Sequence, residues 1–377
     1  MPKRIVFLTG TRADFGKIKS LIEVTQNDKN FDVHIFATGM HMNSKYGKTV
    51  NEIYKSGFTN IYQFINHDEI NHMDRTLAKT IDGFSTYIAE IQPELIIIHG
   101  DRIEALAGAI VASLNNILAA HIEGGEVSGT VDDSIRHAIS KLSHLHLVGN
   151  EQAGQRLVQL GENKENIFLI GSPDLDLMNP DTLPSLEFVK NYYEIPFKNY
   201  ALVMFHPVTT EFDAMQTYAQ NLVKALEDSD RNYIVILPNN DLGSHEIMHE
   251  YKKLSANPKF KIFPSIRFEY FLQLLRNADF LIGNSSTAMH EAPYYHIPAI
   301  NIGSRQKNRS KSKNIINTGY AYKEILQAIE SVKHFCFQKE QFAFGKGNSN
   351  QLFLRLLQQE SFWKTPKQKQ FYDLESK

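Results

Sequence analysis

The sequence contains one cysteine, one tryptophan and no long hydrophobic run. The lone Cys336 excludes an intramolecular disulfide and any zinc or iron–sulfur site that needs several cysteines. Such scarcity is typical of proteins in a reducing compartment. No stretch approaches the roughly 18 apolar residues of a membrane span, and the first apolar run is too short for a signal peptide. We therefore expect a soluble, cytoplasmic protein without a membrane partner.

An excess of charge is also missing. Lysine and arginine together number 40, aspartate and glutamate 42, and the formal net charge is −2. Because dedicated nucleic-acid-binding proteins usually carry an excess of basic residues, we expect no nucleic-acid partner. The sequence has no H-E-x-x-H zinc motif and no P-loop, and no G-x-G-x-x-G follows the first predicted strand. The last absence disfavours a dehydrogenase.

What the sequence does contain is a regular alternation of short apolar runs and amphipathic segments. Its 377 residues, 42% of them apolar, are enough for about two domains. In the first half, the pattern predicts strands at 4–10, 31–39, 59–64, 94–101, 117–123, 144–150 and 166–171. Helices are predicted between them at 14–26, 73–91, 103–114, 131–142 and 151–160. Strands that alternate with helices indicate a parallel, doubly wound sheet.

The alternation stops at residues 171–184, which hold three prolines and are typical of an interdomain link. It then resumes, with strands predicted at 200–206, 233–238, 261–264, 279–283 and 299–302. We expect a first domain at 1–175, a second at 176–349, and a helical tail at 350–377 that packs back on the first. The predicted fold class is α/β, with two doubly wound Rossmann-like domains that face a central cleft.

Ligands of such sheets bind beyond the carboxyl ends of the strands, so polar residues there are the candidates for function. Residues 10–17, GTRADFGK, follow the first strand and open a helix. Free backbone N–H groups at that helix start, together with Arg12, suit a phosphate. A plain strand-to-helix turn with a solvated Arg12 is the alternative.

Three carboxylates, Asp101, Glu123 and Asp132, follow neighbouring predicted strands. Carboxylates that share one pocket acquire different pKa values, which lets one act as an acid and another as a base. Asp101 could instead cap the next helix, and Glu123 could be a solvated loop residue. A metal site is disfavoured because Arg102 and Arg136 lie nearby and would oppose a cation.

The second half carries further polar strand ends, at His206, at Ser265 and at the G-N-S-S sequence of residues 283–286. A G-N-S-S turn that opens a helix offers several N–H and hydroxyl donors to a diphosphate. Glu291 could accept the hydroxyls of a ribose, or could be a surface helix residue. Of the basic residues at 305–313, Arg305 is the best candidate for a phosphate contact, because it directly follows a strand.

Six segments together resemble the hydrolysing UDP-N-acetylglucosamine 2-epimerases, which make N-acetylmannosamine for sialic acid synthesis. They are GTRADFGK (10–17), TGMHM (38–42), HGDRIEALA (99–107), HIEGGEVSGTVDDSIRHAISKLSH (121–144), FHPVT (205–209) and GNSS (283–286). The resemblance runs from Arg4 to about Arg309. Its most specific part is the block from His121, because the non-hydrolysing epimerases lack the SGTVDDSIRH form of this loop.

The resemblance implies a fold like that of the GT-B glycosyltransferases, with a UDP-sugar held between two domains. It implies catalytic roles for Asp101, Glu123, Asp132 and His206. The implied nucleotide-binding set is Arg12, Ser265, Gly283, Asn284, Ser285, Ser286, Glu291 and Arg305. Lys17, His41, Arg102 and Arg136 match positions around the sugar and phosphates. The resemblance further implies a homodimer or homotetramer and a reaction that needs no metal or redox cofactor.

Three alternatives stay open at this point. The first is a hydrolysing epimerase for the diacetylated bacillosamine nucleotide of legionaminic acid synthesis, which would differ only in its contacts to C4 and C6. The second is a GT-B glycosyltransferase that uses the same donor. The third is a UDP-sugar sensor without turnover.

Overall fold

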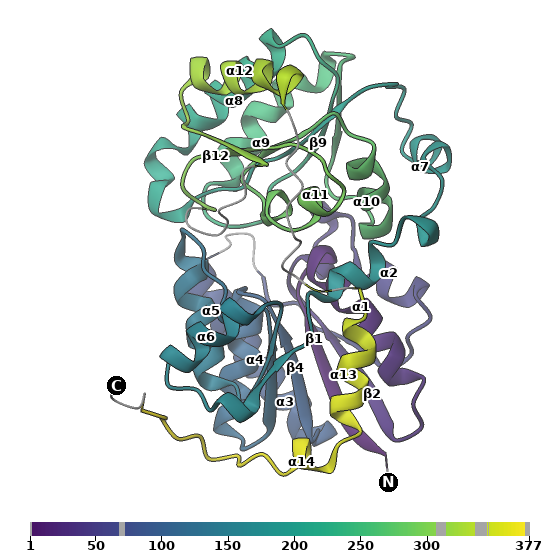
Figure 1. Cartoon of the computed structure of the whole chain (residues 1–377), viewed down its shortest axis with the longest axis vertical. Helices are drawn as coiled ribbons and strands as arrows, with labels where there is room; N and C mark the ends of the chain where they lie inside the picture. The colour runs from purple at the N-terminus through teal and green to yellow at the C-terminus, as the bar shows by residue number, and fades with distance from the viewer. Residues whose placement is uncertain (1, 68–71, 307–313, 336–344, 346, 374–377) are drawn as a thin grey trace. The chain divides into compact units, whose positions relative to one another are not determined.

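The computed structural model describes residues 2–67, 72–306, 314–335, 345 and 347–373. The chain forms two compact units (Figure 1). The N-terminal unit comprises Met1–Glu126, Asp132–Asn179 and Ala343–Lys377, and the C-terminal unit comprises Val127–Val131 and Pro180–Phe342. Among the described residues, no helix has the length and apolarity needed to cross a membrane.

The N-terminal unit is built on a parallel sheet of seven strands in the order β3-β2-β1-β4-β5-β6-β7. Its strands are β1 (Lys3–Thr9), β2 (Phe31–Ala37), β3 (Ile61–Gln63), β4 (Leu95–His99), β5 (Leu118–Ile122), β6 (Leu145–Val148) and β7 (Ile167–Leu169). Its helices before the last segment are α1 (Arg12–Gln26), α2 (Val50–Lys55), α3 (Met73–Ile91), α4 (Ile103–Leu114), α5 (Val131–Leu142) and α6 (Glu151–Gln159). Every residue of β4 and β5 is buried, as expected for central parallel strands with apolar side chains on both faces.

The C-terminal unit has a second parallel sheet, of six strands in the order β10-β9-β8-β11-β12-β13. The strands are β8 (Ala201–Met204), β9 (Tyr233–Ile236), β10 (Phe260–Phe263), β11 (Leu281–Gly283), β12 (Ala299–Ile302) and β13 (Ile315–Thr318). The helices are α7 (Leu186–Tyr192), α8 (Met215–Asp228), α9 (Ser244–Lys253), α10 (Phe268–Arg276), α11 (Glu291–Tyr294) and α12 (Tyr322–Ser331). The expected class, α/β with two parallel sheets, is therefore confirmed.

Sequence and structure differ at three places. The predicted link at 171–184 includes the division between the two units, after Asn179, but it also includes a 3-10 helix, Pro173–Leu177, with buried residues. Strand β13 was not predicted. Only its first residue is buried, so its sequence has a weak apolar pattern. The G-N-S-S turn opens a short 3-10 helix, Ser286–Ala288, instead of a regular α-helix.

The end of the chain completes the N-terminal unit. Helices α13 (Ser349–Leu357) and α14 (Glu360–Trp363) follow, and α13 lies along α1 (Figure 1). The ring of Phe353 packs edge-on against Phe7 of β1 with 6.3 Å between centroids, and the ring of Trp363 stacks on Phe31. The predicted tail is thus helical only as far as Trp363.

Beyond α14, residues 364–373 run without regular structure across the N-terminal unit and reach α5. The ammonium of Lys369 donates hydrogen bonds to the backbone carbonyls of Ser140, Lys141 and Ser143 at the C-terminal end of that helix. It also pairs with the carboxylate of Glu162 at 2.6 Å. A cation at this end of a helix satisfies its last carbonyls and its dipole. The tail therefore stabilises the helix that carries Asp132 and Arg136.

Two histidines are fully buried, His121 on β5 and His41 in the turn after β2. His121 on β5 has Nε2 at 2.8 Å from the carbonyl oxygen of Gly100 and Nδ1 at 3.0 Å from the hydroxyl of Ser140. Nε2 therefore carries the proton and Nδ1 accepts. Burial lowers the pKa of His121 to about 3, so the ring is neutral in the folded protein. Burial, with the charge of Arg12 as a second cause, also lowers the pKa of His41 to about 3.

We predict that Phe353→Ala lowers the free energy of unfolding of the N-terminal unit by about 3–5 kcal/mol, because the ring is fully buried against β1. Urea denaturation followed by tryptophan fluorescence measures this. The matched control is Arg355→Ala, which changes an exposed residue of the same helix. Equal losses in the two variants would contradict the packing described for α13.

A second prediction concerns acid stability. Below pH 6.5 the unfolded chain protonates His121 and the folded chain does not, so the free energy of unfolding falls as the pH falls toward 3. Between pH 6.5 and 5.5 this one residue accounts for a loss of about 1 kcal/mol. His121→Gln should reduce the pH dependence by that amount, whereas His72→Gln, at an exposed position, should leave it unchanged. Urea titrations at the two pH values test this, and identical slopes for all three proteins would refute it.

Candidate functional site

Two of the predicted carboxylates follow neighbouring strands. Because His99 of β4 lies opposite Ile122 of β5 in the sheet, Asp101 and Glu123 leave the same edge side by side. The backbone of Glu123 is left-handed, with φ of 64°. A residue other than glycine pays about 1–3 kcal/mol for such a conformation, which persists where the surrounding structure enforces it. The carboxylate is thereby held in one place after β5.

A buried arginine joins the two carboxylates. Arg136 of α5 is 1% exposed. One terminal nitrogen pairs with the carboxylate of Asp101. The other donates to the backbone oxygen of Glu123 at 3.3 Å and lies 4.0 Å from its carboxylate. The N-cap position of α4 is Arg102, so Asp101 lies one residue before the position at which it was expected as an alternative to cap the helix.

Lys17 of α1 approaches Glu123 from another direction. Its Nζ lies 3.2 Å from Oε1 of Glu123 and 3.8 Å from Oδ2 of Asp174. The ring of His99 lies 3.5 Å from the same oxygen of Glu123. We call Asp101, Glu123, Arg136 and Lys17 the β4–β5 cluster. Asp132, the third predicted carboxylate, lies in the first turn of α5, four residues before Arg136.

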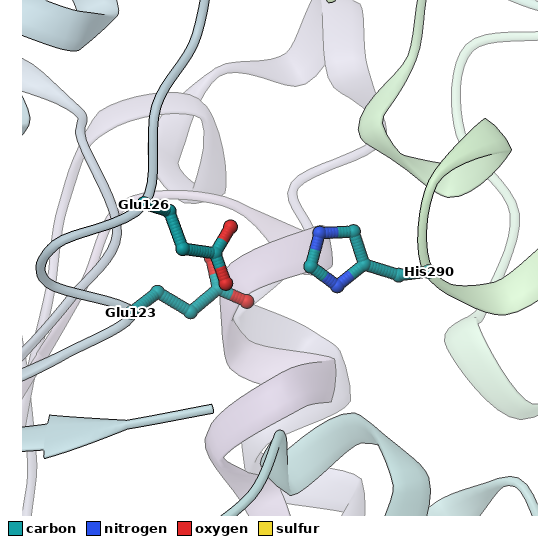
Figure 2. Close-up of side chains that lie close together, drawn as sticks. All are labelled: Glu123, Glu126 and His290. Carbon is teal, nitrogen blue, oxygen red and sulfur yellow. The ribbon is translucent and has the colours of Figure 1, made fainter. Parts of the chain in front are cut away.

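A fourth carboxylate, which the sequence analysis did not single out, lies beside Glu123. Carboxylate oxygens of Glu126 and Glu123 come within 4.8 Å of each other, and Figure 2 shows the two side chains together. The turn between them depends on Gly125, which has φ of 76° and whose Cβ would meet the backbone oxygen of Ala153 at 2.2 Å. In the sequence, two glutamates on either side of a G-G pair could have indicated that Glu126 lies beside Glu123.

The turn at residues 10–17 differs from the expected phosphate loop. Thr11 caps α1 and accepts a hydrogen bond from the N–H of Asp14. The carboxylate of Asp14 in turn accepts from the backbone N–H groups of Gly10, at 2.9 Å, and Thr11, at 3.2 Å. These two N–H groups are therefore not free for a phosphate, because the protein's own carboxylate occupies them. Burial raises the pKa of Asp14. The guanidinium of Arg12 lies 4.0 Å from the carboxylate of Glu52.

Two further predicted residues, His41 and Arg102, contact side chains of the N-terminal unit. His41 is fully buried, with its ring nitrogens 2.7 Å from the hydroxyl of Thr49 and 3.1 Å from that of Thr9. Nε of Arg102 lies 3.5 Å from the carboxylate of Glu104, itself 1% exposed. The structure thus brings together Asp101, Glu123, Arg136 and Lys17, and gives His41 a role in holding the turn after β2.

In the C-terminal unit, the ends of β8 and β11 are locked together by Asn284. Its side chain accepts from the N–H of His206 at 2.6 Å and donates to the carbonyl oxygen of the same residue at 2.8 Å. Gly283 allows this approach, since it has φ of 143° and its Cβ would lie 1.9 Å from the oxygen of Met204. Nδ1 of His206 accepts from the N–H of Asn239 at 3.1 Å, so the proton of the neutral ring lies on Nε2. His206 is thereby set up as a donor.

Arg305 converges on the same turn. Its guanidinium donates to the carbonyl oxygen of Asn284 at 3.4 Å, and the amide of Gln306 donates to that oxygen at 2.9 Å. The hydroxyl of Ser285 accepts from the N–H of Thr287 and caps the 3-10 turn that begins at Ser286. The sequence analysis did not single out Gln306.

The remaining predicted residues of this unit lie on elements other than β8 and β11. Glu291, at the start of α11, is 1% exposed, which rules out the surface alternative. Ser265 follows the edge strand β10, two strands away from β8 in the sheet. The basic residues Lys307, Arg309, Lys311 and Lys313 lie outside the described residues.

The comparisons with known proteins agree with one another. Residues 23–358 match the family model described as UDP-N-acetylglucosamine 2-epimerase. The chain is 49% identical over 375 residues to a UDP-N-acetylglucosamine 2-epimerase of Neisseria meningitidis serogroup B, an alignment that covers 99% of both chains. It is 35% identical to the hydrolyzing UDP-N,N'-diacetylbacillosamine 2-epimerase of Legionella pneumophila, with 95% of this chain and 96% of the relative covered.

Among solved structures, the fold resembles the UDP-GlcNAc 2-epimerase of Methanocaldococcus jannaschii in complex with UDP-GlcNAc and UDP. The TM-score is 0.82 at 21% identity, over 94% of this chain and 99% of that one. This likeness supports the fold, and the sequence matches support the family. The protein therefore belongs to the UDP-N-acetylglucosamine 2-epimerase family of enzymes.

Proposed function

We propose that the protein is a hydrolysing epimerase that converts UDP-N-acetylglucosamine and water to UDP and N-acetylmannosamine. The observation that carries this proposal is the β4–β5 cluster, in which a buried arginine joins two carboxylates at adjacent strand ends. The cluster offers proton-transfer groups that are held in fixed positions. A reaction that inverts a carbon by removing and returning a proton needs such groups.

The C2 proton of the sugar is barely acidic until the C1–O bond weakens. In the proposed mechanism, the electron pair of that bond leaves with UDP, and the pair of the C2–H bond becomes a C1–C2 double bond. Donors aimed at the diphosphate stabilise the charge that develops on it. We assign this task to Arg305, Ser285 and Ser286, with Nε2 of His206 as a further donor and Arg12 contributing from the N-terminal unit.

The proton removed from C2 passes to a carboxylate of the cluster, which yields a 2-acetamidoglucal intermediate. Water then adds at C1, and C2 receives a proton on its opposite face. Two faces require two proton-transfer groups, and Asp101, Glu123 and Asp132 are our candidates, with Arg136 as the residue that orients them. This chemistry needs no metal or redox cofactor.

Two relatives support different parts of the proposal. The name of the Neisseria relative supports N-acetylglucosamine as the sugar, and that of the Legionella relative supports hydrolysis. The loop at residues 128–137, SGTVDDSIRH, is the feature by which the sequence resembles the hydrolysing branch. We further propose a homodimer or homotetramer in the cytoplasm that supplies sialic acid synthesis.

The Legionella relative also supports a second candidate, hydrolysis of the diacetylbacillosamine nucleotide by the same chemistry. The lower identity, 35% against 49% for the Neisseria relative, makes it the second choice.

We predict that proton NMR of the protein with UDP-N-acetylglucosamine in D₂O shows UDP and N-acetylmannosamine that carries deuterium at C2. Deuterium is expected because the returning proton comes from exchangeable groups. The appearance of UDP-N-acetylmannosamine instead would show epimerisation without hydrolysis. An unchanged spectrum, with turnover of the diacetylbacillosamine nucleotide, would establish the second candidate.

We also predict that Asp101→Asn and Glu123→Gln each reduce kcat by about 10²–10⁴-fold, the usual loss when a proton-transfer group is removed. Both variants should remain folded, with a lower melting temperature, because each substitution removes a counter-charge from the buried Arg136 or Lys17. The matched control is Glu151→Gln at an exposed position of the N-terminal unit, which should keep full activity. Turnover near the wild-type rate in either cluster variant would withdraw that residue from the mechanism.

A further inference from the structure

The 3-10 helix Pro173–Leu177 is held against two other helices of the N-terminal unit. The hydroxyl of Ser20 on α1 donates to the carboxylate of Asp176 at 3.0 Å. The same carboxylate accepts from the backbone N–H groups of Ser349 and Asn350, both at 2.8 Å, and so caps α13. Asp174 lies two residues earlier in the same 3-10 helix.

Asp174 is a buried carboxylate with little to stabilise it. The residue is fully buried, and neither side-chain oxygen has a hydrogen-bond partner among the described residues. Its ion-pair partner is Lys17, with 3.8 Å between Nζ and Oδ2. A charge buried without hydrogen bonds is costly, so its presence calls for an explanation beyond packing.

Lys17 lies between this carboxylate and Glu123. The same ammonium that is 3.8 Å from Asp174 donates to Oε1 of Glu123 at 3.2 Å. Lys17 is itself largely buried, with 10% of its side chain exposed. An ammonium in this position needs a nearby negative charge at every stage of the reaction, because water does not surround it.

We propose that Asp174 is a positioning residue that holds the Lys17 ammonium against Glu123 and balances its charge when Glu123 takes the proton from C2. Without Asp174, the protonation of Glu123 would leave a buried ammonium with one counter-charge fewer, and the transfer would be opposed. Lys17 keeps its own proton throughout. The inference rests on the proposed function only in that Glu123 handles the C2 proton.

The first test is Asp174→Asn, which removes the charge and keeps the shape. We expect kcat for C2 deuterium exchange to fall at least about tenfold, with KM within about twofold of the wild type, since Asp174 does not touch substrate. The loss should be smaller than the 10²–10⁴-fold typical of a direct proton-transfer group. The melting temperature should change little, because in the resting enzyme Lys17 keeps Glu123 as its nearer counter-charge, at 3.2 Å, and because the removed charge has no hydrogen bond.

The matched control is Asp176→Asn in the same 3-10 helix. Asp176 accepts the backbone N–H groups at the start of α13, so this variant should melt at a lower temperature and keep its kcat. If Asp174→Asn behaves like the control, with a lower melting temperature and an unchanged kcat, Asp174 is structural and the proposal is overturned. A change in KM alone would overturn it as well.

A double-mutant cycle tests the route through Lys17. We compare Lys17→Met, Asp174→Asn and the double variant by deuterium incorporation over long incubations, which measures slow rates. If Asp174 acts through Lys17, its substitution adds no further loss to Lys17→Met. Losses that multiply in the double variant would show an independent role and overturn the proposal.

The wild type, assayed with both UDP-sugars, separates the two proposals. If the wild type yields UDP-N-acetylmannosamine, hydrolysis is contradicted. Deuterium exchange at C2 would still occur, so the double-mutant cycle of Lys17 and Asp174 could still be measured. Hydrolysis in the wild type with no effect of Asp174→Asn refutes only the role of Asp174. A wild type that exchanges no C2 proton in either sugar leaves Glu123 without a proton to carry, and both proposals fall.

Discussion

The site depends on one buried guanidinium. Arg136 pairs with the carboxylate of Asp101 through one nitrogen and donates to the backbone oxygen of Glu123 through the other, so it ties the two strand ends together. The other features of the N-terminal unit hold this arrangement in place. His121 fixes the turn before Asp101, and Lys369 satisfies the last carbonyls of the helix that carries Arg136.

In the C-terminal unit, backbone and amide groups hold neighbouring strand ends together. The side-chain amide of Asn284 forms two hydrogen bonds with the backbone of His206, and these bonds hold the ends of β8 and β11 together. The close approach requires a glycine at position 283. The N–H of Asn239 then donates to Nδ1 of the His206 ring.

Periodicity and strand-end position predicted the sheets and much of the β4–β5 cluster. The bounds predicted for α3, α4 and α5 match the structure, because α3 and α5 have strong apolar faces and α4 is apolar on nearly all sides. Sequence reasoning could not find Asp174, because its importance comes from Lys17, more than 150 residues away along the chain. It also left the turn at residues 10–17 open between a phosphate site and a plain strand-to-helix turn, since only the structure shows that the carboxylate of Asp14 accepts from its N–H groups.

The C-terminal helix α13 has a consequence for how the chain is made. The N-terminal unit includes residues on both sides of the segment 180–342, which forms most of the C-terminal unit. A ribosome that adds about 5–20 residues per second needs roughly 10–40 seconds between Asn179 and Trp363. During that interval the face of the first sheet that α1 partly covers lacks Phe353, while the second unit can already fold. The N-terminal unit is therefore the first to emerge and the last to be completed.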